Sequence, residues 1–468
     1  MEKLKKLITQ LPEEDYRGIE GSLVHNKSEK FLFLLKTMRH NGLSDEQLAA
    51  HLRCNGNALH VLKSRLYDKV QKHLVDKTPA MAAPLSGARL ETARLLYDQP
   101  RETALAILLE LEKKHLQNDV PGELIDIYSA LKKAHYNSDK YYVYSQLYNK
   151  QMAYTVALEK AEDLLFNFNK TLSHYHFSRA ENDLDLLKVY KSEINNIYAL
   201  NQSHRLELIR NCITIQMLLY TPLALKEEED LEDLLAHSEQ LIADFPGDKQ
   251  LVYYARVLNF FRFEYYMQLG QDKKAQRFLE FTDELAASWL LLSPLCQAYR
   301  FLFSRMIYEE RTGYKKAGAA WNGQHDFYTE VALRICEALA HFAAGRLKEA
   351  CLLLKNLINE ASFKEFFHIE TEIKLTLAYF YVLQSNYELA ESLLKSVSRK
   401  LTDRKEEYRH VKAFVRFVVL LMDRKNKTIT PDKLKEALLQ FNRHNTGPLR
   451  ILDFLQPGLN KRYLQTGV

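Results

Sequence analysis

Glycine and proline are both scarce in this chain, with 15 and 11 among 468 residues. The hairpins of many-stranded β proteins depend on these two residues for their turns. Their scarcity therefore argues against such a fold. It favours long helices that are joined by tight turns.

Paired cysteines and long apolar runs are missing as well. The five cysteines, Cys54, Cys212, Cys296, Cys336 and Cys351, stand singly and form no CxxC pair, which is typical of reduced thiols in a cytosolic protein. The longest uncharged stretches, residues 211–225 and 285–299, are shorter than the roughly 18–20 residues that cross a bilayer. The first residues, MEKLKKLITQL, contain no continuous apolar segment of a secretory signal. We therefore expect a soluble cytoplasmic protein without membrane insertion.

Sequence motifs of common catalytic and metal sites are also absent. The segment AGAAWNG at residues 317–323 has glycines but lacks the GxxxxGK[ST] pattern, and there is no HExxH, EF-hand or doubled CxxC motif. His174 and His176 would point to opposed faces of a helix, so they would need further ligands to hold a metal. Cys336 has no evident His and Asp companions and is expected to fill a core. The sequence thus predicts a non-enzyme with no cofactor and no bound metal.

Helical periodicity is the dominant pattern that is present. In residues 104–116 and 411–423, apolar residues recur three and four positions apart, and no segment alternates strictly between apolar and polar residues. An all-α fold follows. Residues 78–88 have the proline, glycine and small side chains of a linker, so residues 1–77 are predicted to be a separate N-terminal helical unit.

A helix-pair pattern recurs in the second half of the chain. It is clearest in residues 331–359, where one apolar helix ends at Gly345, a second begins at once, and Ala350 lies where the two helices meet. The same arrangement recurs around three other alanines. The packing positions are Ala275, Ala317, Ala350 and Ala390, with spacings of 42, 33 and 40 residues.

These pairs resemble tetratricopeptide repeats, a family with a period of about 34 residues. Gly270 and Gly345 match the family's turn position, and Tyr314 and Tyr387 match its aromatic position, but the family's helix-opening Trp and closing Pro are missing. The resemblance is clearest over residues 251–400. It implies an α-solenoid over residues 89–445, followed by a C-terminal tail at 446–468. An irregular helical bundle is the alternative.

The resemblance also implies a binding surface. In repeat solenoids the first helix of each pair lines a concave face that commonly binds peptides. Aromatic residues crowd residues 253–266, which predicts a helix buried between layers or one that exposes a stripe to a groove. The groove candidates are Tyr254, Phe261, Tyr265, His341 and Tyr379. The first hypothesis is therefore a non-enzymatic scaffold that binds a partner protein or peptide.

The basic residues are concentrated near the N-terminus. Residues 21–77 contain ten lysines and arginines against five acidic residues, an excess as large as the formal +5 of the whole chain. Ser44 is placed to cap a short helix, Asn55-Gly56-Asn57 breaks the chain, and a second helix is predicted over residues 58–74.

This arrangement resembles the helix-turn-helix of sigma-factor-type regulators, with Leu62–Leu66 (LKSRL) as the matching piece of the recognition helix. The gap before this piece is longer than in the family, which would move Lys63 and Arg65 away from the base-reading end and favour phosphate contacts. The candidate nucleic-acid contacts are Arg53, Asn57, His60, Lys63, Arg65 and Lys69. The second hypothesis is therefore a DNA-binding regulator with a partner-sensing solenoid. A helical cap with a solvated basic face is the alternative for this unit.

Overall fold

The computed structural model describes most of the chain. In the N-terminal part it describes residues 4, 5, 8, 9, 11, 13–26, 28–40, 43–77, 105, 108, 109, 111–113, 115 and 116. From residue 121 it describes 121–222, 230–246, 248, 250–287, 298–313, 326–401, 408–423, 430–444 and 451–460. Helices dominate these residues and no β-strand occurs among them, which confirms the predicted all-α fold.

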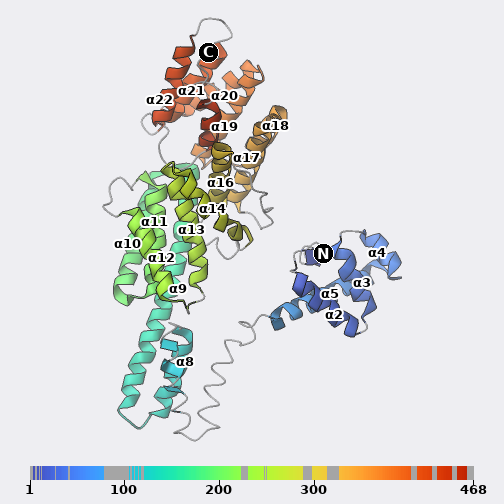
Figure 1. Ribbon diagram of the computed structural model, residues 1–468, viewed down its shortest axis with the longest axis vertical. Helices are drawn as coiled ribbons and strands as arrows, with labels where there is room; N and C mark the ends of the chain where they lie inside the picture. Colours follow the sequence, from blue (N-terminus) through green and yellow to red (C-terminus); the bar gives the residue numbers. More distant parts are fainter. Residues whose placement is uncertain are drawn as a thin grey trace. The chain divides into compact units, whose positions relative to one another are not determined.

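The chain divides into two compact units, Met1–Asn149 and Lys150–Val468. Its N-terminal part includes the helices α2 (Glu13–His25), α3 (Glu29–Arg39), α4 (Asp45–His51) and α5 (Gly56–Lys77) (Figure 1). Helices α2, α3 and α4 each pack against α5. Their shared core is built from residues of the predicted inner faces, including Leu34, Leu48 and Leu66. The predicted linker at 78–88 lies outside the described residues.

A separate apolar cluster is formed by described residues between Leu105 and Tyr148 of the first unit. It centres on α8 (Pro121–Ala134), where Leu124, Tyr128 and Leu131 are buried. The long helix α9 (Lys140–Ser178) begins in this unit and runs on into the second. Tyr144 near its start packs against the α8 cluster.

The second unit continues as helices packed in sequence. After α9 come α10 (Glu181–Asn201), α11 (His204–Tyr220), α12 (Leu231–Asp244), α13 (Leu251–Gln268) and α14 (Asp272–Ala287). Helices α10 and α11, α11 and α12, and α13 and α14 are packed neighbours. Their core combines apolar faces from all of these helices with the middle of α9.

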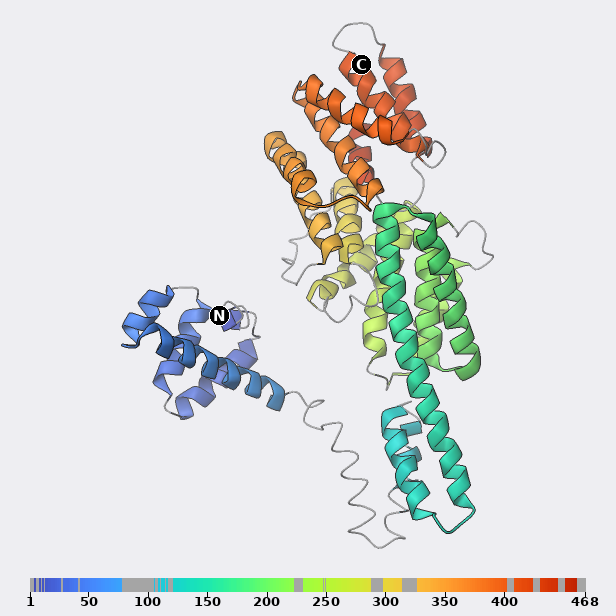
Figure 2. The ribbon, with the colours of Figure 1, turned by 180° about the vertical axis from the view of Figure 1, so that it is seen from behind.

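The later part of this unit repeats the pairing. Its helices are α16 (Ala298–Thr312), α17 (Phe327–Ala343), α18 (Leu347–Glu360), α19 (Phe367–Leu383), α20 (Tyr387–Lys400), α21 (Arg409–Asp423), α22 (Pro431–His444) and α23 (Ile451–Asn460). Helices α17 and α18, α19 and α20, and α21 and α22 pack as successive pairs, which can be followed from orange to red in Figure 2. The first helices α19 and α21 also touch each other. The described part of the unit is therefore solenoid-like.

The final helix corrects one prediction. Residues 451–460 are not a tail, because they form α23, which packs against α16, α19 and α22. Ile451, Leu452 and Leu455 are buried in the C-terminal core. The apolar spacing ILDFL was short and followed Pro448, so the sequence did not indicate where this helix would dock.

The turns inside three pairs share one geometry. Gly270, Gly345 and Ser385 all have φ between 66° and 77°, the left-handed region that favours glycine. In each turn a backbone N–H reaches back five residues: Gln271 to Tyr266, Arg346 to His341 and Asn386 to Tyr381, at 2.8–2.9 Å. This is the hydrogen bond of a Schellman-type helix ending. Ser385 adopts the same turn without glycine, in the pair that was predicted around Ala390.

The described alanines of the predicted seams, where the two helices of a pair meet, are buried as predicted. Ala275, Ala350 and Ala390 are fully buried, and Ala317 lies outside the described residues. Each of the three lies in the first turn or two of a second helix, directly after the shared turn. A methyl side chain at this place lets the two helix backbones approach closely.

Enlarging a seam alanine should therefore destabilise the stack. We expect Ala350→Leu to lower the free energy of unfolding by about 1–3 kcal/mol, because extra methylenes force the packed helices apart. Ala340→Leu is the matched control, since Ala340 is exposed on α17 of the same pair. Urea denaturation of both variants measures the difference, and equal stabilities would contradict the packing role of Ala350.

Candidate functional sites

Two of the five predicted groove residues are wrong. Phe261 and Tyr379 are buried in the core, at 0% and 3% exposure, and do not line a surface. Helix α13 is covered by α11, α12, α14 and α16, and α19 is covered by α18, α20, α21 and α23. Contacts on so many sides cover Phe261 and Tyr379, although other positions of α13, such as Tyr265, stay partly exposed. The aromatic crowding of residues 253–266 thus reflects burial between layers.

The other three groove candidates remain partly exposed. Tyr254, Tyr265 and His341 all lie on the first helices of pairs, with part of each side chain accessible. His341 Nδ1 accepts a hydrogen bond of 2.8 Å from Arg346 Nε, across the turn to the second helix. Burial and then the carboxylate of Glu232 raise the pKa of Tyr265, so its phenol stays neutral at physiological pH. Their role in binding stays a prediction.

The N-terminal unit contains two helices, α4 and α5, joined by a short turn where the sequence predicted a break. Ser44 caps α4 with a complete capping box, in which the Ser44 side chain accepts from Gln47 N and Gln47 Oε1 accepts from Ser44 N. The turn to α5 spans residues 52–55, with Arg53 at φ 47°. Asn55 Oδ1 then caps α5 by accepting from Ala58 N at 2.8 Å. Both helix starts are therefore fixed by local polar side chains.

The predicted nucleic-acid contacts divide into one that is buried and five that are exposed. Lys63 is wrong as a phosphate contact: it is only 4% exposed, and its Nζ lies 2.5 Å from Asp45 Oδ1 on α4. Position 63 faces α4 because it falls on the inner side of α5, where the short α4 supplies the carboxylate. The exposed ones are Arg53, Asn57, His60, Arg65 and Lys69.

A buried polar cluster that the sequence did not predict lies inside the second unit. Its centre is the ion pair between Glu264 of α13 and Arg300 of α16, in which Arg300 Nη2 lies 3.3 Å from Glu264 Oε1. Both side chains are almost fully buried. Tyr220 and Ser304 donate hydroxyl hydrogen bonds to the two oxygens of Glu264, and the Arg300 guanidinium stacks over the Tyr220 ring at 3.5 Å. A buried carboxylate is thus surrounded by donors.

His176 extends this cluster toward α9. Its Nδ1 lies 2.5 Å from the Tyr299 hydroxyl, and its Nε2 lies 3.4 Å from the carbonyl oxygen of Tyr220. Arg300 Nη1 also lies 3.3 Å from Nδ1 and 3.4 Å from Nε2, and a guanidinium can only donate, so at least one ring nitrogen of His176 is an unprotonated acceptor. Burial, followed by the positive charge of Arg300, holds the pKa of His176 well below its usual value. The imidazole is therefore neutral, as this hydrogen-bonding pattern requires.

Burial also sets the charge states of the neighbouring acids. It raises the pKa of Glu264, and the Arg300 guanidinium opposes that shift. It raises the pKa of the Tyr299 phenol, which keeps its proton available for His176. The cluster thus pairs Glu264 with Arg300 at its centre, with neutral groups around them, and it joins α9, α11, α13 and α16.

Beside this cluster lies a group of potential metal ligands. His368 and Glu372 on α19 and His410 on α21 each offer one ligand atom, and the three atoms lie within 4.8 Å of one another. All three side chains are buried. His368 Nε2 lies 3.2 Å from Glu372 Oε1, and Glu372 Oε2 accepts a hydrogen bond of 2.8 Å from Ile451 N. Among the residues that the structure describes, no other such group of three occurs.

A small cavity connects the two groups. Its volume is about 30 Å³, and its lining includes His176, Arg300, His368, Glu372 and Ile451. This volume suffices for one or two water molecules, since a cavity of about 10–15 Å³ holds one. The cavity is too small for an organic substrate, but it is large enough for an ion or water.

Sequence reasoning missed both groups for an identifiable reason. His368 and Glu372 are four residues apart on one helix, which is a detectable signal for a shared face. His410 follows 38 residues after Glu372, and the His176, Glu264 and Arg300 side chains come from three other helices. No sequence spacing brings those helices together.

The pair His174 and His176 behaves as expected from opposed faces. His174 Nδ1 lies 2.6 Å from Asp183 Oδ2, whereas His176 contacts Tyr299.

The free thiols of Cys212 and Cys336 have pKa values raised to about 12 by burial. Such thiols stay protonated and pack as apolar groups, as predicted for Cys336.

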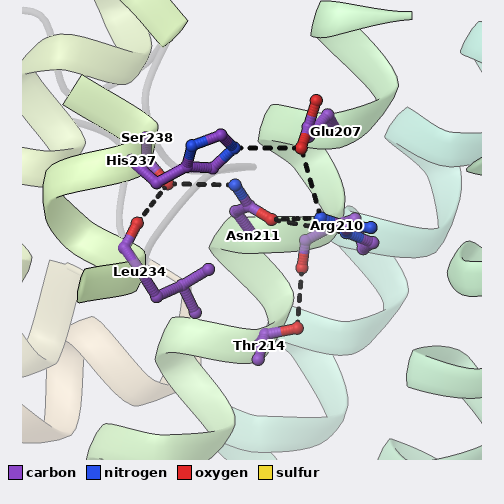
Figure 3. Close-up of polar contacts among 7 residues, drawn as sticks. All are labelled: Glu207, Arg210, Asn211, Thr214, Leu234, His237 and Ser238. Atoms are coloured by element: carbon purple, nitrogen blue, oxygen red, sulfur yellow. Dashed lines mark hydrogen bonds and ion pairs between the residues drawn. The ribbon is translucent and has the colours of Figure 1, made fainter. Parts of the chain in front are cut away.

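A second polar network ties α11 to α12 (Figure 3). Asn211 Nδ2 donates to Ser238 Oγ at 3.1 Å, and Ser238 Oγ donates to the Leu234 carbonyl at 2.8 Å. Closer to solvent, His237 Nε2 lies 3.0 Å from Glu207 Oε1. The serine hydroxyl is thus committed to its own helix and to Asn211, and the network serves as a helix-to-helix contact.

Comparisons with known proteins found nothing similar: no protein family, curated protein or solved structure matches this chain. None of the described helices combines the length and the apolar character that a membrane-spanning segment needs.

Proposed function

We propose that the protein is a non-enzymatic scaffold that binds a partner protein or peptide along tetratricopeptide-like helix pairs. The observation that carries this proposal is the repeated turn, with one geometry in the pairs α13–α14, α17–α18 and α19–α20. The repeated turn gives the first and second helices of these three pairs the same connection. Partly exposed side chains on successive first helices then form a series of contacts for an extended partner.

The first helices also offer more exposed side chains than the sequence singled out. Glu337 on α17 and Lys412 and Arg416 on α21 are exposed, beside His341 on α17. Tyr265 on α13 adds a half-buried aromatic side chain. This mixture of charge and aromatic surface suits a peptide that carries both polar and apolar side chains.

The experiment is selection of binding peptides from a displayed library on the purified chain, followed by fluorescence polarisation. We expect Tyr265→Ala and His341→Ala each to weaken the binding of a selected peptide by at least about tenfold. This is the loss typical of a contact worth about 1.4 kcal/mol. Both variants should unfold at nearly the wild-type urea concentration, because the two side chains are only partly buried.

Leu352→Ala and Leu389→Ala are the matched controls. Both leucines are more than half exposed, but they lie on the second helices α18 and α20. These two variants should bind the peptide as the wild type does. Binding that depends on the leucines and is indifferent to Tyr265 and His341 would refute the assignment to the first helices.

A second candidate function is DNA binding by the N-terminal unit. It is favoured by the short turn between α4 and α5. Asn57 and His60 lie near the start of α5, and Arg65 and Lys69 follow on its exposed surface. Basic side chains on such a helix can contact phosphates of a duplex. Lys63 takes no part, because Asp45 neutralises it.

Fluorescence anisotropy with a labelled duplex at low salt tests this function. We expect Arg65→Ala to reduce the slope of log K against log salt by about one, the change expected when one phosphate contact is lost. Lys69→Glu should weaken binding further through repulsion. Lys30→Glu makes the same charge change at an exposed position on α3 and should have a smaller effect. If the wild type does not bind at low salt, the unit is a structural cap.

A further inference from the structure

The group formed by His368, Glu372 and His410 has the composition and placement of a metal site. Its three ligand atoms come from two adjacent helices and lie within 4.8 Å of one another. All three side chains are at most 4% exposed. Two imidazoles and one carboxylate converging in a buried place are a common ligand set of zinc and of other first-row divalent metals.

We propose that His368, Glu372 and His410 bind one divalent transition-metal ion, with Zn²⁺ as the best fit. Ligands about 2.0–2.1 Å from a tetrahedral ion are about 3.3 Å apart. The distance of 3.2 Å between His368 Nε2 and Glu372 Oε1 already matches this separation. The ligand atom of His410 lies within 4.8 Å of the other two, which makes it the third member of the set.

The residues around the group support the ligand arrangement. Ile451 N donates to Glu372 Oε2 at 2.8 Å, which holds the carboxylate with its other oxygen, Oε1, toward His368. Such contacts behind a ligand orient it and are typical of metal sites. The cavity of about 30 Å³ borders His368 and Glu372, so a water molecule can occupy the fourth position.

An ion pair alone accounts for the arrangement less well. A His368–Glu372 pair needs only two side chains, whereas a second imidazole from α21 also converges on the same place. The positive charge of Arg300, which borders the same cavity, is paired with Glu264. Two histidines beside one carboxylate are best explained by a cation that all three bind.

The site would join three parts of the C-terminal fold. His368 and Glu372 come from α19, His410 comes from the start of α21, and Ile451 begins α23. The ion would therefore link two successive helix pairs to the final helix. Because the small cavity admits water but no organic substrate, the inference is a structural role for the metal, which is independent of the proposed partner binding.

The test uses the full chain, stripped with a chelator and titrated with Co²⁺, whose visible absorption reports its coordination. We expect one Co²⁺ per chain, an absorption spectrum of four- or five-coordinate cobalt, and displacement by Zn²⁺. Glu372→Gln and His410→Gln should each weaken Co²⁺ binding by at least about tenfold. Glutamine at 372 keeps an acceptor for Ile451 N, so the fold is preserved as far as possible.

His204→Gln is the matched control. His204 is also buried and lies 3.1 Å from Asp248, but it belongs to α11 and does not border the site. This variant should bind Co²⁺ as the wild type does. The X-ray absorption spectrum of the zinc-loaded wild type gives a readout that needs no variant, and we expect it to show imidazole and oxygen ligands without sulfur.

The proposal is overturned if the wild type binds no Co²⁺ or Zn²⁺ in stoichiometric amount. It is also overturned if binding is unchanged in both ligand variants, or if the zinc spectrum requires sulfur ligands. Each of these results concerns the metal alone, because none depends on a peptide or on DNA.

Discussion

Replacing Arg300 by alanine is expected to lower the free energy of unfolding of the second unit by about 3–5 kcal/mol. The change leaves Glu264 fully buried without its guanidinium partner, and it also removes the stacking over Tyr220. An uncompensated buried charge is among the most destabilising features that a single substitution can produce. Urea denaturation followed by circular dichroism measures the loss.

The control for Arg300→Ala is Arg334→Ala. Arg334 contacts Glu330 and Glu360, but this cluster is largely exposed, so its loss should cost about 0–1 kcal/mol. A double variant, Glu264→Gln with Arg300→Leu, removes both charges and should be less destabilised than the sum of its single changes. Similar losses in Arg300→Ala and Arg334→Ala would show that the buried pair contributes no more than a surface contact.

Phe261→Ala should destabilise the chain by about 3–5 kcal/mol, since it leaves a cavity in a closely packed core. The Phe261 side chain is fully buried and packs with Tyr220 and Phe260. If Phe261 instead lined a groove, as the sequence suggested, its loss would change binding and leave stability nearly intact. Thermal and urea denaturation of the purified variant distinguish these outcomes.

Tyr253→Ala on the same helix is the comparison for Phe261→Ala. Tyr253 is 37% exposed at the start of α13, so its loss should change the free energy of unfolding by only about 0.5 kcal/mol. A loss for Phe261→Ala no larger than the loss for Tyr253→Ala would mean that position 261 faces solvent. The buried position of α13 between its neighbouring helices would then be wrong.

Partner binding and metal binding concern different parts of the protein, so either proposal can fail without the other. Partner binding relies on the exposed sides of α13 and α17, whereas the metal site is buried between α19 and α21. Loss of the metal would affect the docking of α23 first, because Ile451 N is bonded to Glu372. If the chain binds metal but no peptide, the metal site is supported and the proposal of partner binding is rejected.

Helices α4 and α5 show how far local signals in the sequence reach. Ser44 was predicted to cap a helix and does so with a complete capping box. The predicted second helix at 58–74 lies within α5, and its inner residues Leu59, Leu66 and Val70 are buried. Capping and apolar spacing act between residues that are at most four apart, so the sequence contains them in full.

The same helix shows where local signals end. Lys63 and Arg65 are two residues apart, and both were predicted to contact nucleic acid. Only the packing of α4 against α5 placed Lys63 beside Asp45 and left Arg65 exposed. Likewise, the spacing of aromatic residues over 253–266 predicted an apolar helix. It did not determine that Phe261 would be covered and Tyr265 partly exposed. That distinction depends on how many helices surround α13.

The sequence by itself determined the all-α class, the helix pairs and the alanine seams, because each depends on residues close together along the chain. Only the tertiary structure decided which faces are covered, and it alone brought Glu264 to Arg300 and His410 to Glu372. These contacts join helices that are distant in sequence. Their positions follow from the packing of the whole stack, which no local spacing encodes.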